Sequence, residues 1–206
     1  LSMQWGWNHN PEPAKWSLTE KPGHLRLSTV RVTSDFRMAR NTLTQRMFSY
    51  YSDSTLTVGT TKMDFSQMRE GDVAGLAIFQ DPYAYIAIKK TGGKHFITMV
   101  NNGEVIDSVE TDASTIYFRA TPFFGSGAAP LYGGDFVPET GTASFYYSFD
   151  NENFTKLGNE LKMRFNLSVF TGNKFCLFNY PTKETGGFVD FDWFRMQPVN
   201  KNLMID

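Results

Sequence analysis

Residues 73–110 read VAGLAIFQDPYAYIAIKKTGGKHFITMVNNGEVIDSVE, and this stretch decides the fold class. Apolar and polar side chains alternate along much of it, which is the two-residue period of strands with one buried face. Asp81-Pro82, Gly92-Gly93 and Asn102-Gly103 interrupt the alternation, and Asn-Gly is a strong signal for a two-residue hairpin turn. The stretch therefore predicts a meander of four strands, over 73–80, 83–90, 94–101 and 104–110.

The same period recurs on both sides of the meander. It predicts further strands over 24–32, 42–51, 55–63, 115–121, 143–149, 161–169, 174–180 and 188–196. No sustained helical period appears, and the one helical suggestion is a short turn over 64–70, with Asp64 as its N-cap and Gly71 at its end. Many short strands at regular spacing are typical of sandwiches and jelly rolls. We predict an all-β, two-sheet antiparallel β-sandwich in one domain over 1–206, with a core to about 197 and a tail over 198–206.

The composition excludes several classes of partner. The net charge is −1 and both signs are scattered along the chain, so no basic stripe suits nucleic acid. No apolar run is long enough to cross a bilayer, and no polybasic segment suggests binding to a membrane surface. The one cysteine, Cys176, lies among apolar residues and is predicted to be a small buried hydrophobe. The compartment stays open, and the start at Leu1 suggests a piece of something longer.

Catalytic motifs are scarce. The nearest to an acid pair is Asp190-Phe191-Asp192, whose two carboxylates are predicted to share one face of the final strand. They could act as acid and base, as ligands of a structural calcium ion, or as plain structural residues. His9, His24 and His95 lack the spacing of a zinc site or a nucleophile scheme. No cofactor is required by any motif in the chain.

The N-terminal segment is the densest candidate for a binding surface. Three of the four tryptophans lie between residues 5 and 16, beside a run of amide and imidazole groups. Sugars stack their apolar faces on aromatic rings and need planar donors and acceptors for their hydroxyls. The alternative is that the tryptophans cap the core and the polar run ties down a loop. The candidate residues of this segment are Trp7, Asn8, His9 and Asn10.

Three further features allow either a functional or a structural interpretation. Gln45 and Arg46 lie in a predicted strand among aromatic residues, where an arginine either lines a groove or forms a buried, paired charge. Arg119 offers the same choice in another strand. Tyr83 and Tyr85 alternate with apolar residues, so they form either a stacking platform on the concave sheet or the solvent side of a strand.

Several strings along the chain resemble one known family. The matches include Trp-x-Trp-Asn-His-Asn-Pro over 5–11, Ala-Arg-Asn-Thr-Leu-Thr-Gln-Arg over 39–46, Gly-Asp-x-Ala-Gly-Leu over 71–76 and Gly-x-Val-Asp-Phe-Asp-x-Phe over 187–194. In this order they resemble the C-terminal domain of family 43 glycoside hydrolases, the β-xylosidases and α-arabinofuranosidases. The matches run from near Trp5 to Arg195, which is almost the whole chain.

The resemblance implies a concanavalin A-like sandwich that follows a five-bladed propeller. In such enzymes the propeller carries the catalytic acids, and the sandwich packs against it and helps to shape the substrate pocket. Related domains have been classed as modules that bind xylan. The implied partners are therefore xylan or xylo-oligosaccharide and an N-terminal propeller domain, with no nucleic acid and no membrane.

The leading hypothesis is a non-catalytic accessory domain of a β-xylosidase-type enzyme. Its sugar-binding or domain-docking residues are expected among Trp7, Asn8, His9, Asn10, Gln45, Arg46, Tyr83, Tyr85 and Arg119. One alternative is a self-sufficient sandwich glycosidase that depends on Asp190 or Asp192. The other is a purely structural docking module, which would bind no sugar.

Overall fold

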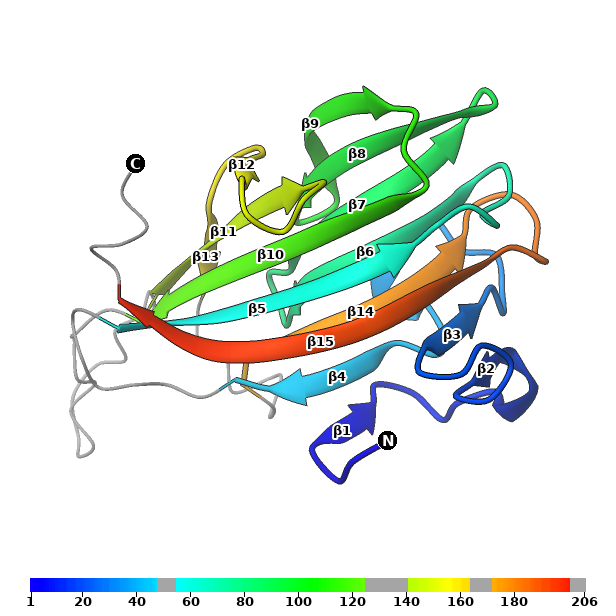
Figure 1. Cartoon of the computed structure of the whole chain (residues 1–206), viewed down its shortest axis with the longest axis horizontal. Helices are drawn as coiled ribbons and strands as arrows, with labels where there is room; N and C mark the ends of the chain where they lie inside the picture. The colour runs from blue at the N-terminus through cyan, green and yellow to red at the C-terminus, as the bar shows by residue number, and fades with distance from the viewer. Residues whose placement is uncertain (48–54, 125–140, 164–171, 201–206) are drawn as a thin grey trace.

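The chain folds into two antiparallel sheets packed face to face (Figure 1). This computed structural model describes residues 1–47, 55–124, 141–163 and 172–200. Sheet A has seven strands in the order β1-β4-β14-β6-β7-β8-β9. Its bounds are β1 Trp5–Trp7, β4 Leu43–Arg46, β14 Lys174–Pro181, β6 Asp72–Phe79, β7 Ala84–Thr91, β8 Lys94–Asn101 and β9 Glu104–Thr111.

Sheet B has the order β12-β11-β10-β5-β15-β3-β2, with β13 paired on β11. Its bounds are β12 Thr155–Lys156, β11 Gly141–Ser148, β10 Thr115–Phe124, β5 Thr55–Asp64, β15 Phe188–Asn200, β3 Leu25–Ser28, β2 Trp16–Ser17 and β13 Leu161–Met163. The two-sheet antiparallel β-sandwich predicted from the alternation is therefore confirmed. The predicted strand residues 48–51 and 164–169 lie outside the described residues.

The meander over 73–110 is confirmed as four consecutive antiparallel strands, β6 to β9. Asn102 and Gly103 have φ angles of 50° and 90°, the left-handed pair that a type I′ hairpin turn requires. Gly75 on β6 shows how closely these strands pack, because a Cβ there would lie 2.1 Å from the Ile86 carbonyl oxygen. A local pattern with matching turn residues is enough to predict this half of sheet A.

The main core fills the space between the sheets. Its largest fully buried side chains include Phe65, Phe118, Phe145 and Phe175, which come from both sheets or the turn beside them. Cys176 points to the opposite face of sheet A and is fully buried there, as predicted. Both faces of sheet A are thus covered over its middle strands.

The second buried cluster lies on the outer face of sheet A and corrects one prediction. Phe36, in the short 3-10 helix η2 (Phe36–Met38), covers Tyr83 and Tyr85 with ring centroids 5.1 and 5.2 Å away. The two tyrosines are only 4% and 6% exposed, and the Tyr85 hydroxyl lies 3.1 Å from that of Tyr180. They are therefore neither a stacking platform nor the solvent side of a strand. A segment distant in sequence folds over this face and buries it.

The helical turn predicted over 64–70 is also wrong. The Asp64 carboxylate does accept hydrogen bonds from the Ser66 amide and hydroxyl at 3.1 and 2.7 Å, and Gly71 has a φ of 90°. The start and stop residues are thus as predicted, but they enclose a turn rather than a helix. Among the described residues the helices are η2 and η1 (Pro13–Lys15), and neither is long and apolar enough to span a membrane.

Candidate functional site

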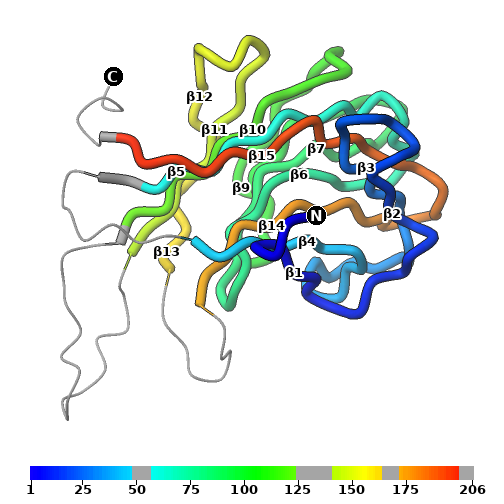
Figure 2. Tube along the Cα trace, turned by 60° about the horizontal axis from the view of Figure 1, so that its bottom comes forward, coloured from blue at the N-terminus to red at the C-terminus, as the bar shows by residue number. Residues whose placement is uncertain are grey.

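Strand β1 forms the edge of sheet A and pairs with β4, which separates it from β14 (Figure 2). Trp5 lies opposite Gln45 and Trp7 opposite Leu43, while the Gly6 carbonyl accepts a 2.8 Å hydrogen bond from the Thr44 hydroxyl. Side chains alternate along a strand, so both tryptophans point to the same face. That face packs against the core between the sheets, and both rings remain partly exposed.

The second half of the N-terminal motif anchors the chain. The Trp7 ring packs at 5.2 Å from that of Trp16. The backbone amide of Asn8 donates to the Thr42 carbonyl at 3.0 Å. His9 Nε2 lies 2.9 Å from the Arg37 carbonyl, to which it must donate a hydrogen bond. These contacts tie residues 7–9 to β2, to Thr42 just before β4, and to η2, whereas the side chains of Asn8 and Asn10 are exposed.

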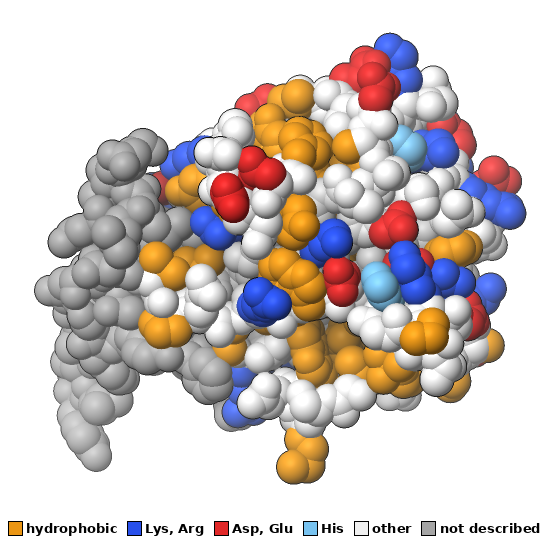
Figure 3. Space-filling view, viewed as in Figure 1, with side chains coloured by type: hydrophobic (Ala, Val, Ile, Leu, Met, Phe, Trp, Pro, Cys, Tyr) orange, Lys and Arg blue, Asp and Glu red, His pale blue; other side chains and the backbone are white. Residues whose placement is uncertain are grey.

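An apolar hollow of about 370 Å³ lies between β1 and β15. Pairing of β15 with β3 ends at Phe191, and none of the described strands pairs with the next residues of β15 on that side. The Trp5 ring meets Phe194 edge to face at 5.3 Å. Hydrophobic side chains gather over β1 and the adjoining part of β15 in the space-filling view (Figure 3). The lining is Leu1, Trp5, Leu18, Gly23, His24, Leu25, Leu43, Leu177, Phe191, Asp192, Trp193 and Phe194.

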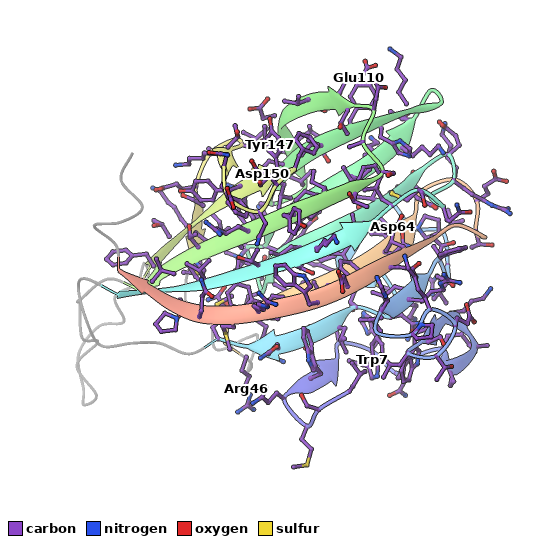
Figure 4. The ribbon with its side chains drawn as sticks, in the orientation of Figure 1. Trp7, Arg46, Asp64, Glu110, Tyr147 and Asp150 are labelled. Atoms are coloured by element: carbon purple, nitrogen blue, oxygen red, sulfur yellow. The ribbon has the colours of Figure 1, made fainter. Side chains whose placement is uncertain are left out.

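A polar hollow of about 440 Å³ adjoins it at Trp5, which lines both. Gln45 is 8% exposed, whereas Arg46 is exposed and projects from the end of β4 beside β1 (Figure 4). Lys174, the first residue of β14, completes the cationic side. The lining is Met3, Gln4, Trp5, Gly6, Thr44, Gln45, Arg46 and Lys174.

Arg119 does not belong to this site. It lies on β10 of sheet B, with its guanidinium carbon 3.5 Å from the centre of the Phe154 ring and Nε donating to the Thr60 hydroxyl at 3.3 Å. Burial lowers the pKa of this guanidinium, and no carboxylate pairs with it among the described residues. Arg119 is therefore half-buried over a ring, rather than a groove residue or a paired charge.

Asp190 and Asp192 do not form a pair. A β-bulge between Phe191 and Trp193 separates them along β15, and each faces its own cation. Asp190 is buried and accepts two hydrogen bonds from Arg26, at 2.8 and 2.9 Å. Asp192 lies 3.3 Å from the Lys62 ammonium.

This arrangement does not fit a calcium site. Calcium takes six to eight oxygen ligands, and each of these two carboxylates already faces a cation. In the part of the chain that the structure describes, no group of three or more His, Cys, Asp or Glu side chains is placed to hold a metal. The candidate site therefore consists of the two hollows alone.

The two hollows suit binding better than bond cleavage. Glycoside hydrolysis by side chains needs two carboxylates on either side of one bond. Asp192 is the one carboxylate in the described lining of the apolar hollow, and that of the polar hollow contains none. An aromatic ring beside amide and cationic groups matches a sugar with both apolar and polar faces.

The predicted site residues do not include two residues of the linings, Trp5, which belongs to both hollows, and Lys174, the second cation of the polar hollow. Trp5 belongs to the N-terminal motif, but nothing in the motif itself favours it over Trp7. Lys174 joins the hollow because β14 pairs with β4, which no local pattern reveals. Gln45 and Arg46 do line a hollow, as one interpretation of the sequence predicts. The four predicted residues Trp7, Asn8, His9 and Asn10 lie outside both linings.

Comparisons with known proteins agree with this architecture. The family model described as the β-xylosidase C-terminal concanavalin A-like domain matches residues 1–197. A protein of Formosa agariphila named β-xylosidase is 30% identical over 218 residues, which cover 94% of this chain and 33% of the relative. The chain thus spans about a third of the length of that relative.

Solved structures show the same fold. A Bacteroides eggerthii protein described as a bifunctional GH43-CE superposes with a TM-score of 0.84 at 39% identity, over 96% of this chain and 24% of that one. A second, an engineered GH43 glycoside hydrolase with endo-xylanase and exo-arabinofuranosidase activity, superposes with a TM-score of 0.84 at 32% identity, over 97% and 39% of the two chains. This chain belongs to the concanavalin A-like C-terminal domains of the family 43 β-xylosidases.

Proposed function

We propose that this chain is a non-catalytic accessory domain that binds xylan or xylo-oligosaccharides at the two hollows beside β1. The observation that carries the proposal is the position of Trp5, which lines an apolar and a polar hollow at once. A xylose ring has an apolar face and a rim of hydroxyls, so a sugar chain lying across β1 meets both kinds of surface. The names of the relatives, a β-xylosidase and an engineered endo-xylanase, agree with a xylan-type ligand.

The catalytic acids are proposed to lie in another domain, the five-bladed propeller that the family resemblance implies. Support comes from the surroundings of Asp190, the best catalytic candidate, because a carboxylate held by two bonds from Arg26 is not free to transfer protons. The chain covers 24% and 39% of the length of two solved relatives, which leaves room for such a domain in proteins of this kind. Beside binding sugar, the domain would help to shape the pocket of that propeller.

Trp5→Ala is expected to weaken the binding of xylohexaose to the 206-residue chain by about tenfold, which is about 1.4 kcal/mol. The variant removes the ring of the residue that belongs to both linings, and tryptophans are frequent among residues that dominate binding energy. Isothermal titration calorimetry measures the affinity. Trp5→Phe keeps a ring in place and should retain most of the binding.

Trp7→Ala is the matched control. The Trp7 ring packs on Trp16 and lines neither hollow, so its loss should lower the melting temperature and leave the affinity for xylohexaose within about twofold. All titrations are run well below the melting temperature of the least stable variant. Equal affinities for Trp5→Ala and the unchanged chain would remove the basis of the proposal.

A further inference from the structure

Two like charges face each other at one end of sheet A. Arg46, the last residue of β4, lies directly opposite Lys174, the first residue of β14. Residues opposite each other in an antiparallel pair project to the same face, and like charges there are destabilising. Burial lowers the pKa of the Lys174 ammonium, and the positive charge of Arg46 lowers it further.

In the part of the chain that the structure describes, no acidic side chain compensates this pair. Among the described residues neither Arg46 nor Lys174 has a carboxylate within ion-pair distance. Several other cations of the chain do have such partners, for example Arg37 with Asp81 at 2.9 Å. Two adjacent cations without a carboxylate partner create a positive electrostatic potential at this end of sheet A.

The hollow beside this pair has room for a sugar-sized group. Its volume of about 440 Å³ falls within the range of small-ligand pockets. A Cβ added to Gly6 would meet nothing closer than the Thr44 hydroxyl oxygen at 4.0 Å, so no neighbouring atom obstructs the hollow next to Gly6. The Thr44 hydroxyl already donates to the Gly6 carbonyl. The polar side chains that remain in the lining to hold a ligand are the amides of Gln4 and Gln45 and the two cations.

We propose that the polar hollow binds the carboxylate of a uronic acid carried as a substituent on a xylan chain. A guanidinium presents two parallel N–H donors to a carboxylate, and the ammonium adds a second charge-assisted bond. The neutral xylose rings lie in the adjoining apolar hollow, since Trp5 belongs to both linings. This inference rests on the proposed function, because it names the kind of xylan that the same surface prefers.

Calorimetry on the 206-residue chain tests the inference with three probes. They are a xylo-oligosaccharide carrying one glucuronic acid, the same compound with its carboxylate reduced to the alcohol, and the unsubstituted xylo-oligosaccharide. The acidic probe is expected to bind at least about tenfold more tightly than either neutral probe at low salt. Added salt should reduce this advantage, because mobile ions screen exposed charges.

Arg46→Gln and Lys174→Gln are each expected to abolish most of that tenfold preference, measured within each variant as the ratio of its affinities for the acidic and the unsubstituted probe. Lys162→Gln is the matched control, because Lys162 is an exposed cation on β13 of the other sheet. An equal loss of preference in Lys162→Gln would show a general charge effect and overturn the inference.

The remaining outcomes separate the two proposals. Equal affinity for acidic and neutral probes would overturn the uronate site and leave the xylan-binding function standing. Absence of binding to all three probes would overturn the proposed function together with the inference. Recovery of activity when the chain is added to a truncated enzyme, without any sugar binding, would overturn both proposals in favour of a docking role for the domain.

Discussion

Replacing Asp190 by asparagine is expected to lower the free energy of unfolding by about 3 kcal/mol. The side chain of Asp190 is 5% exposed and that of Arg26 18%, and two hydrogen bonds of 2.8 and 2.9 Å join them. An amide removes the buried counter-charge of the guanidinium, which then keeps only the exposed Glu20 carboxylate at 2.9 Å, and losing a buried partner is costly. Lys21, 3.4 Å from the same carboxylate, loses a partner as well. Urea denaturation followed by tryptophan fluorescence measures the change.

Asp192→Asn provides the control for this prediction. Asp192 and Lys62 are 35% and 33% exposed at a separation of 3.3 Å, and exposed pairs of this kind contribute about 0.5 kcal/mol. A structural calcium site shared by the two aspartates would behave differently, because both variants and a chelator would then destabilise the chain together. Equal losses in the two variants, or a melting temperature that rises with added calcium, would contradict the account of Asp190 as a structural ion pair.

The second large effect is a change in the pH dependence of stability in Asp72→Asn. Asp72 is fully buried, its Oδ2 accepts the Arg69 amide at 2.7 Å, and its Oδ1 has no hydrogen-bond partner among the described residues. Burial raises the pKa of this carboxyl to about 6. A raised pKa means that the folded state holds the proton more tightly than the unfolded state. The contribution of Asp72 to stability is therefore present at low pH and is lost as the pH rises through about 6.

The amide in the Asp72→Asn variant carries no charge at any pH. The variant should therefore become more stable relative to the unchanged chain as the pH rises. The difference in unfolding free energy between the two is expected to change by about 2.5 kcal/mol between about pH 4 and pH 7.5, in favour of the variant. Burial lowers the pKa of the His95 ring, so the contribution of His95 to stability changes with pH in the opposite direction. It is present in both proteins, so only the difference between the two curves is informative. Parallel curves over this range would show that Asp72 does not titrate there.

The fold can be predicted from the sequence wherever the information is local. The strands and turns over 73–110 need only alternation and turn residues, and both are visible in a single stretch. The prediction for Tyr83 and Tyr85 fails because alternation suggests one buried face on β7, whereas Phe36 closes the other face from a distant segment. The separate ion pairs of Asp190 and Asp192 could not be predicted, because each carboxylate meets a cation from a different strand, β3 or β5.

The candidate site, too, could be predicted only where the information is local in the sequence. Gln45 and Arg46 are predictable as groove residues, but the second cation of the hollow, Lys174, comes from a strand far along the chain. The choice between Trp5 and Trp7 depends on which ring meets Trp16 and which meets Phe194. Residue types alone carry no information on such pairings, since both tryptophans have the same alternating position on one short strand.

The central claim, that sugar binds across β1, is tested most directly by the indole N–H signals of the four tryptophans, Trp5, Trp7, Trp16 and Trp193. Single tryptophan-to-phenylalanine variants assign the signals, and the unchanged chain is then titrated with xylohexaose. We expect the Trp5 signal to shift along the binding curve and the Trp16 signal, whose Nε1 is buried, to stay in place. Saturation with xylohexaose without any shift of the Trp5 signal would contradict the account.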